Sequence, residues 1–294
     1  MSITTVTGFT TLDNGIRVFA RTAGPQDGSN VLLLHGFPSS SHQFRNLIPI
    51  LAAQGCRVTA PDLPGFGFTE IPEHLKFKYS FANIATTISS FLDKVNIKTF
   101  AVYIFDYGAP TGLRLALERP DSVKAIISQN GNAYEEGLLP FWDPLKKLWD
   151  TLPGSEEDSE LRSTIANAIL TYDATKWQYT EGEPDPEKID PLSWTLDAAL
   201  LERPGQQKIQ LDLFRDYATN VELYPKFQGY FRASQVPLLA VWGKNDQIFG
   251  HPEAFKKDLP NANVESLDGG HFLVESHTKE LAERIVKFLN GISF

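Results

Sequence analysis

Short apolar runs alternate with helical patterns along the first 130 residues of the chain. Four of the runs lie at 31–34, 57–60, 100–105 and 123–129, and the run at 31–34 consists only of apolar side chains. The solid apolar character of 31–34 is typical of a strand that is covered on both faces, and the alternation of runs and helices is typical of parallel strands joined by crossover helices. The pattern therefore predicts an α/β fold with a mostly parallel central sheet flanked by helices.

Three further patterns extend this prediction. Asn14-Gly15 is typical of a hairpin turn between two strands near the amino terminus. Strand character returns at 237–242 and near Val264. Two helices are predicted from apolar faces, one of which contains Pro49, a residue that makes its continuity doubtful; their faces are Phe44, Leu47, Ile48 and Leu51, and Leu281, Ile285, Phe288 and Leu289 before a C-cap at Asn290-Gly291.

The alternation stops between about residues 132 and 234. This segment is helical in pattern, rich in Trp and Tyr, and interrupted by a loop-like stretch at 181–186. We predict a core domain formed by 1–131 and 235–294, with 132–234 as an inserted helical cap subdomain.

Composition and charge exclude several classes of protein. The formal charge is −9, from 36 acidic and 27 basic residues, so no basic surface is expected for nucleic acid or an anionic membrane. The single cysteine, Cys56, excludes an intramolecular disulfide and fits a reducing compartment. The amino terminus has no signal-peptide pattern and no segment is apolar enough to span a bilayer. We expect a cytoplasmic protein, and a homodimer is compatible with the sequence.

Asp106 is the strongest candidate for a nucleophile. It directly follows the strand at 100–105 and precedes a helical stretch, as in the sharp strand-to-helix turn that exposes a nucleophile above a sheet. Gly108 supplies the small residue two positions later, whereas Ile104 departs from the small residue expected two positions earlier. The chain contains no G-x-S-x-G motif for a serine nucleophile. The alternative is that Asp106 only N-caps the following helix.

Two further residues complete a catalytic arrangement. Asp246 follows the strand at 237–242, and His271 comes 25 residues later in Gly269-Gly270-His271-Phe272. The order nucleophile, acid, histidine is that of the α/β-hydrolase triad. Taken alone, either residue is more often a loop carboxylate or a surface histidine, so the order carries the hypothesis.

The loop His35-Gly36-Phe37-Pro38 follows the first buried strand. In this architecture, such a loop supplies a backbone N–H that stabilises an oxyanion together with the N–H that follows the nucleophile. The predicted oxyanion hole is therefore formed by the backbone of Phe37 and Tyr107.

With these residues, the chain resembles the epoxide hydrolase and haloalkane dehalogenase branch of the α/β-hydrolase superfamily. The resemblance extends over essentially the whole chain and rests on HGFP at 35–38, DLPGFGFT at 62–69, DYGAP at 106–110, WGKND at 242–246 and GGHF at 269–272. It implies the α/β-hydrolase fold with a cap, and a small apolar electrophile and water as reactants, with no cofactor and no metal.

The resemblance also implies a two-step reaction. The carboxylate of Asp106 attacks an electrophilic carbon and forms an alkyl ester. His271 then activates a water that hydrolyses the ester, while Asp246 orients the histidine.

The leaving group distinguishes epoxides from halides. Haloalkane dehalogenases bind the halide with a Trp beside the nucleophile and often an Asn in the first loop, but this chain has Tyr107 and Phe37 at these places. This favours an epoxide.

An epoxide oxygen needs a proton donor, which epoxide hydrolases supply with cap tyrosines. Tyr217 resembles the second of these, and we expect it to act as the general acid. The first has no clear counterpart near residues 145–149, and Tyr134 and Tyr179 are the substitutes to consider as substrate-binding residues.

Two alternatives stay open. Trp149 with Tyr217 resembles part of the halide pocket of fluoroacetate dehalogenases, although Tyr107 and Pro110 replace the arginines that bind a haloacid. A hydrolase-fold receptor without activity is the non-enzymatic alternative, since a fold alone does not fix function.

Overall fold

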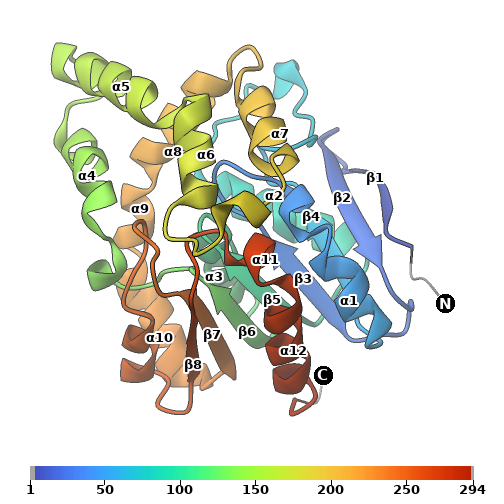
Figure 1. The fold of residues 1–294 in the computed structure, drawn as a ribbon. Coiled ribbons are helices and arrows are strands. Elements are labelled where there is room, and N and C mark those ends of the chain that lie inside the picture. Colours follow the sequence, from blue (N-terminus) through green and yellow to red (C-terminus); the bar gives the residue numbers. More distant parts are fainter. Residues whose placement is uncertain (1–3, 293–294) are drawn as a thin grey trace.

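A single eight-stranded sheet forms the centre of the protein. The computed structural model describes residues 4–292, and the strands occur in the order β1-β2-β4-β3-β5-β6-β7-β8 across the sheet (Figure 1). Their bounds are β1 Val6–Thr11, β2 Arg17–Ala23, β3 Asn30–Leu34, β4 Arg57–Pro61, β5 Phe100–Phe105, β6 Val123–Gln129, β7 Leu238–Gly243 and β8 Asn263–Leu267.

The strand pairing confirms the predicted mostly parallel sheet. β1 and β2 form the expected antiparallel hairpin, and β2 also pairs antiparallel with β4. All pairs from β4 through β3, β5, β6 and β7 to β8 are parallel. The carboxyl ends of β3, β5, β6, β7 and β8 therefore meet at one edge of the sheet.

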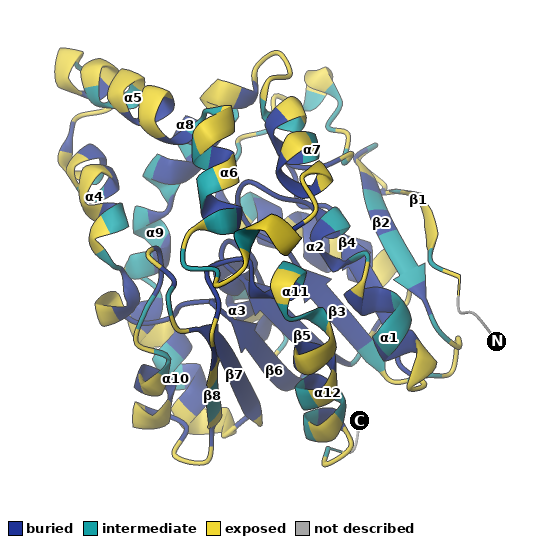
Figure 2. Ribbon diagram, in the orientation of Figure 1, coloured by how far each residue is buried: buried dark blue, intermediate teal, exposed yellow. Residues whose placement is uncertain are grey.

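Helices cover both faces of the sheet, because successive side chains of each strand point to opposite faces. On one face, Leu33 and Tyr103 pack with α1, α11 and α12; on the other, Leu32 and Val102 pack with α2, α3 and α10. Figure 2 shows the buried sheet between helices whose outer sides are exposed. The bounds are α1 Leu47–Ala53, α2 Phe81–Lys94, α3 Gly108–Glu118, α10 Tyr224–Ser234, α11 Leu273–Ser276 and α12 Thr278–Leu289.

The segment between β6 and β7 is helical. It contains α4 Asp143–Asp150, α5 Glu156–Ile169, α6 Tyr172–Thr180, α7 Leu192–Leu201, α8 Gln206–Asp216, α9 Ala218–Val221 and α10. In Figure 1, α4 to α8 lie together above the sheet, whereas α10 packs against α3 beside it. The last helix of the predicted cap range thus lies in the layer of the core helices. The division of the chain into core and cap stays a prediction.

Six short 3-10 helices connect these elements, at Ser41–Phe44, Glu73–Leu75, Glu135–Gly137, Pro140–Trp142, Pro186–Lys188 and Pro252–Lys257. Within residues 4–292, no helix is both long and apolar enough to cross a membrane.

The predicted helix through Phe44 is broken. Phe44 ends a 3-10 turn, and α1 begins only at Leu47. This start places Pro49 in the first turn, where a backbone N–H has no partner within the helix and the missing donor does no harm. The doubt about continuity is therefore confirmed, but the interruption lies between Phe44 and Leu47 and not at Pro49; the apolar face is buried as expected.

Ile104 occupies the position where a small residue was expected before the nucleophile. A Cβ on Gly112 of α3 would lie 2.6 Å from Ile104 Cγ2. The space for the large side chain therefore comes from the facing helix, and Gly112 compensates for the departure at position 104.

This compensation makes a prediction for paired substitutions. Gly112→Ala is expected to lower the free energy of unfolding by about 1–3 kcal/mol, because overpacking strains a dense core. Ile104→Ala alone leaves a cavity and costs about 2–5 kcal/mol. Urea unfolding of the double variant should show a loss clearly smaller than the sum of the two, and additive losses would contradict the proposed contact.

Candidate active site

Asp106 lies in a sharp turn at the carboxyl end of β5. Its backbone is left-handed, with φ of +46°, and α3 begins two residues later. The turn requires Gly108, because a Cβ there would lie 2.2 Å from the carbonyl oxygen of Leu34. Asp106 does not cap α3, since the N-cap position is Tyr107 and no side chain bonds the helix end. The N-cap alternative is therefore wrong.

The two predicted oxyanion donors hold one oxygen of Asp106. The backbone N–H groups of Phe37 and Tyr107 each donate to Asp106 Oδ1 over 2.6 Å. Gly36 makes this approach possible, because a Cβ there would lie 2.2 Å from the same oxygen. Both of the hydrogen bonds that Asp106 accepts among residues 4–292 go to Oδ1, none to Oδ2, and Asp106 is 4% exposed. One oxygen is thus fixed and the other is free to react.

His271 and Asp246 form the expected pair. His271 Nδ1 lies 2.9 Å from Asp246 Oδ2, and both residues are buried. The ring of His271 packs on Phe105, the residue before Asp106, with ring centres 4.7 Å apart. Its Nε2 is buried and finds no partner in the described part of the chain. The histidine is therefore fixed through one nitrogen and free at the other.

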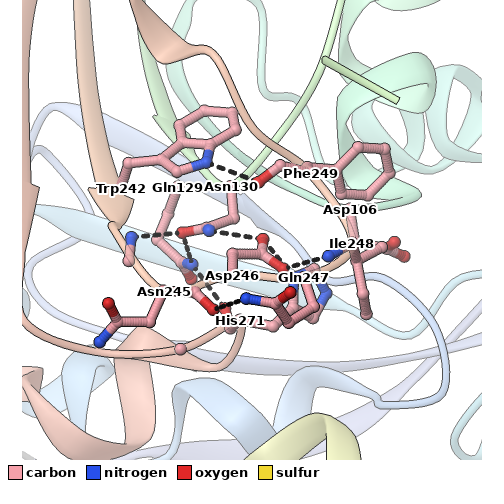
Figure 3. A network of polar contacts seen from close by, with 12 residues as sticks. Asp106, Gln129, Asn130, Trp242, Asn245, Asp246, Gln247, Ile248, Phe249 and His271 are labelled. Carbon is pink, nitrogen blue, oxygen red and sulfur yellow. Dashed lines mark hydrogen bonds and ion pairs between the residues drawn. The ribbon is translucent and has the colours of Figure 1, made fainter. Parts of the chain in front are cut away.

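Asn130 was not identified from the sequence. It follows β6 with φ of +48°, and its Nδ2 donates to Asp246 Oδ2 over 2.6 Å, while its Oδ1 accepts the N–H of Gly243 over 3.0 Å (Figure 3). The other oxygen of Asp246 accepts the N–H of Ile248 over 2.7 Å. Asn130 thus links the ends of β6 and β7 and orients the acid.

A second polar residue of β6 supports the histidine loop. Gln129 Nε2 donates to the carbonyl oxygen of His271 over 2.9 Å (Figure 3). Its Oε1 accepts the hydroxyl of Tyr103 over 2.9 Å. The signal in the sequence was Ser128-Gln129-Asn130, three polar residues at the carboxyl end of an otherwise apolar strand. Because β6 lies between β5 and β7, this polar end necessarily lies between Asp106 and Asp246.

Burial dominates the electrostatics of the site. It raises the pKa of Asp106 to about 6, against the opposing effects of His271 and the two backbone N–H groups. Burial alone would lower the pKa of His271, but the charge of Asp246 and its hydrogen bond outweigh burial and raise it. The environment of Asp106 therefore disfavours its ionised form, whereas the environment of His271 favours its protonated form.

Tyr217 lies beside the nucleophile. It is fully buried, and its ring lies 5.8 Å from that of Tyr107 and 4.2 Å from that of Trp142. Its hydroxyl oxygen lies 3.3 Å from that of Tyr224, a residue that the sequence did not single out. The predicted general acid thus has a polar neighbour on α10.

Asn132 holds the hydroxyl of Tyr224 from its other side. Its Oδ1 accepts the N–H of Tyr134 and its Nδ2 donates to the carbonyl oxygen of the same residue, so the orientation of the amide is fixed. Asn132 Nδ2 also donates to the hydroxyl of Tyr224 over 3.2 Å. Either tyrosine can be the donor between Tyr217 and Tyr224; when Tyr224 donates, the proton of Tyr217 is left for another acceptor.

The other cap residues have their polar atoms engaged elsewhere. The hydroxyl of Tyr134 donates to Asp258 over 2.8 Å, and that of Tyr179 donates to Asp197 over 2.5 Å. Trp149 stacks on Tyr217, but its indole N–H donates to the carbonyl oxygen of Phe214. The expectation that Tyr134 or Tyr179 replaces the first cap tyrosine is therefore wrong, because a carboxylate already accepts each hydroxyl proton.

The loop after α6 holds the histidine loop from the cap side. Glu183 accepts the N–H of Gly270 over 2.8 Å, and Asn245 Nδ2 donates to the carbonyl oxygen of Gly182 over 2.8 Å. A Cβ on Gly270 would lie 2.1 Å from the carbonyl oxygen of Glu181, so the two backbones are in close contact. No group of three potential metal ligands occurs among residues 4–292.

Comparison with known proteins identifies the family to which this architecture belongs. Residues 30–278 match the family model described as alpha/beta hydrolase fold. An uncharacterized hydrolase of Saccharomyces cerevisiae is 46% identical over 94% of both chains, and a haloalkane dehalogenase of Psychrobacter cryohalolentis is 39% identical over 95% of this chain and 89% of its own. A crystal structure of an epoxide hydrolase of Vigna radiata has a TM-score of 0.75 at 22% identity, with 98% of each chain covered, a likeness of fold.

The raised pKa of Asp106 predicts a gain in stability on removing its charge. A folded-state pKa of about 6 lies above the ordinary value of 3.8, so the wild type loses stability as the pH rises from about 4 to about 6. Asp106→Asn keeps an oxygen for both backbone N–H groups and should unfold at a higher temperature at pH 8, by the equivalent of about 2–3 kcal/mol. At pH 4 the two proteins should be equal. Asp27→Asn, at an exposed position, is the control; a variant that is less stable at pH 8 would contradict the assignment.

Proposed function

The chain belongs to the alpha/beta hydrolase fold family, and on this basis we propose that it opens small epoxides to vicinal diols through an ester of Asp106. The observation that carries the proposal is the state of the Asp106 carboxylate, with Oδ1 held by two backbone N–H groups and no hydrogen bond to Oδ2 from the described residues. A carboxylate held in this way is suited to attack carbon.

In the first step, Asp106 Oδ2 forms a bond to one carbon of the epoxide. The bond between this carbon and the ring oxygen breaks, and the oxygen takes the proton of Tyr217. The contact with Tyr224 supports this role, because a proton donated by Tyr224 to the Tyr217 oxygen leaves the proton of Tyr217 for the substrate.

In the second step, His271 Nε2 accepts a proton from water, and the resulting hydroxide attacks the ester carbonyl. The oxyanion forms at the oxygen that the N–H groups of Phe37 and Tyr107 already hold. Asp246 stabilises the imidazolium. Collapse of the oxyanion releases the diol and restores Asp106, and the histidine proton returns to Tyr217 through solvent.

An epoxide substrate is favoured over a haloalkane because the indole N–H groups that could bind a halide already donate to backbone carbonyl oxygens. The indole N–H groups of Trp142, Trp149 and Trp242 all donate to backbone carbonyl oxygens, those of Ile248, Phe214 and Phe249. A dehalogenase reaction with the same three residues is the second candidate, and the relative named as a haloalkane dehalogenase favours it. Release of halide from a panel of haloalkanes, measured beside diol formation from a panel of epoxides, separates the two.

Trapping of the ester tests the mechanism. His271→Gln should form the ester but hydrolyse it slowly, so intact-protein mass spectrometry should show an adduct with the full mass of the epoxide, located on Asp106. Asp106→Asn is the control and should show none. The mechanism is rejected if His271→Gln forms no adduct with an epoxide that the wild type hydrolyses.

Substitution of the tyrosines tests the assignment of the acid. Tyr217→Phe should slow epoxide opening by roughly 10²- to 10⁴-fold, the usual contribution of a general acid. Tyr224→Phe should have a smaller effect in the same direction, since it leaves the donor in place but removes its orientation. Single-turnover measurements of ester formation report both, and an unchanged rate in Tyr217→Phe would exclude it as the acid.

A further inference from the structure

Tyr107 has a buried hydroxyl without a partner beside the nucleophile. The residue is 1% exposed, and no atom of residues 4–292 forms a hydrogen bond with its hydroxyl. His271 Nε2, which also lies at this site, is in the same condition. For His271 the missing partner is the reacting water, which raises the question of what the missing partner of Tyr107 is.

The surroundings of the Tyr107 ring give no structural reason for a hydroxyl. The ring packs edge-on against Phe81 with centres 4.8 Å apart, and Phe37, Phe66 and Phe214 lie around it. A phenylalanine would fill the same space and form the same ring contacts. Burying a hydroxyl without a hydrogen bond costs free energy of folding, so packing alone favours phenylalanine.

Tyr107 also contacts both Asp106 and Tyr217, the nucleophile and the acid of the proposed reaction. Its backbone N–H holds Asp106 Oδ1 over 2.6 Å, and its ring lies 5.8 Å from the ring of Tyr217. The two tyrosine rings are therefore neighbours, one on the nucleophile turn and one at the end of α8.

We infer that the hydroxyl of Tyr107 is the second donor to the epoxide oxygen and acts with Tyr217. This inference rests on the proposed function and deepens it, because it fills the place of the tyrosine that the cap does not provide. The missing partner of the buried hydroxyl is then the ring oxygen of the substrate.

The chemistry of the first step is balanced with this donor included. Asp106 Oδ2 bonds to carbon, the carbon–oxygen bond breaks, and the oxygen receives one proton, from Tyr217. Tyr107 keeps its proton and donates a hydrogen bond to the developing alkoxide. Burial and the charge of Asp106 raise the pKa of Tyr107, so its hydroxyl holds its proton in the free protein.

Tyr107→Phe tests the inference, because it removes only the hydroxyl and keeps both the ring and the backbone N–H. We expect the rate of ester formation from an epoxide to fall by roughly 10- to 100-fold, while the rate of ester hydrolysis in the same single-turnover experiment stays unchanged. The thermal midpoint should stay equal or rise, since a buried hydroxyl without a partner is lost.

Tyr230→Phe is the matched control. Tyr230 is another buried tyrosine, but it lies on α10 near the amino ends of β6 and β7, at the opposite end of the strands from Asp106. Its substitution should leave both rates unchanged.

The outcomes separate this inference from the proposed function. Wild-type rates of ester formation in Tyr107→Phe, with an epoxide that the wild type opens, would overturn the role of Tyr107 and leave the proposed function intact. A wild type that opens no epoxide in the panel would reject the proposed function, and the inference with it. A loss of rate that is equal in ester formation and ester hydrolysis would show a general disturbance of the site, which also overturns the inference.

Discussion

The paired backbone N–H groups that hold Asp106 Oδ1 are the interaction on which the site depends. They can reach this oxygen only because the chain turns sharply after β5 and because position 36 has no side chain. The two donors hold the carboxylate in the resting protein and, in the proposed mechanism, would also hold the oxyanion of the ester. The left-handed backbone of Asp106 and the raised pKa of its carboxyl group are the costs of this arrangement.

Around this point, hydrogen bonds hold most of the buried polar groups, whereas His271 Nε2 and the hydroxyl of Tyr107 have no partner among the described residues. The oxygens of Asp246 are taken by His271, Asn130 and Ile248, so this carboxylate is held in place beside the histidine. The amides of Gln129, Asn130 and Asn132 are anchored to backbone groups, and each fixes a partner nearer the reaction. In each case the backbone fixes the amide group, and the amide group then orients a residue of the site.

The sequence was sufficient for the sheet and for the geometry of the turn, loop and histidine, because strand ends and motif order depend on short-range patterns. Ile104 was misleading for a physical reason, since the space it needs is provided by Gly112 on a different element. Tyr134 and Tyr179 could not be assessed from the sequence, because all the candidate tyrosines are buried and only their hydroxyl partners differ. The polar end of β6 indicated Asn130 but not its partners Asp246 and Gly243, and nothing local indicated the contact between Tyr224 and Asn132, because these residues lie far apart in the chain.

The contacts of the loop at 181–183 bear on the order of events in a turnover. This loop grips Gly270 and Asn245, next to the base and the acid, whereas the contacts that hold Asp106 come from β3, β5 and their loops. If the helices above the sheet move apart to admit a reactant, the first residues to lose their support are the neighbours of His271 and Asp246. In the proposed reaction, attack on carbon could then begin in a partly open molecule, whereas hydrolysis of the ester would need the loop back on Gly270 and Asn245.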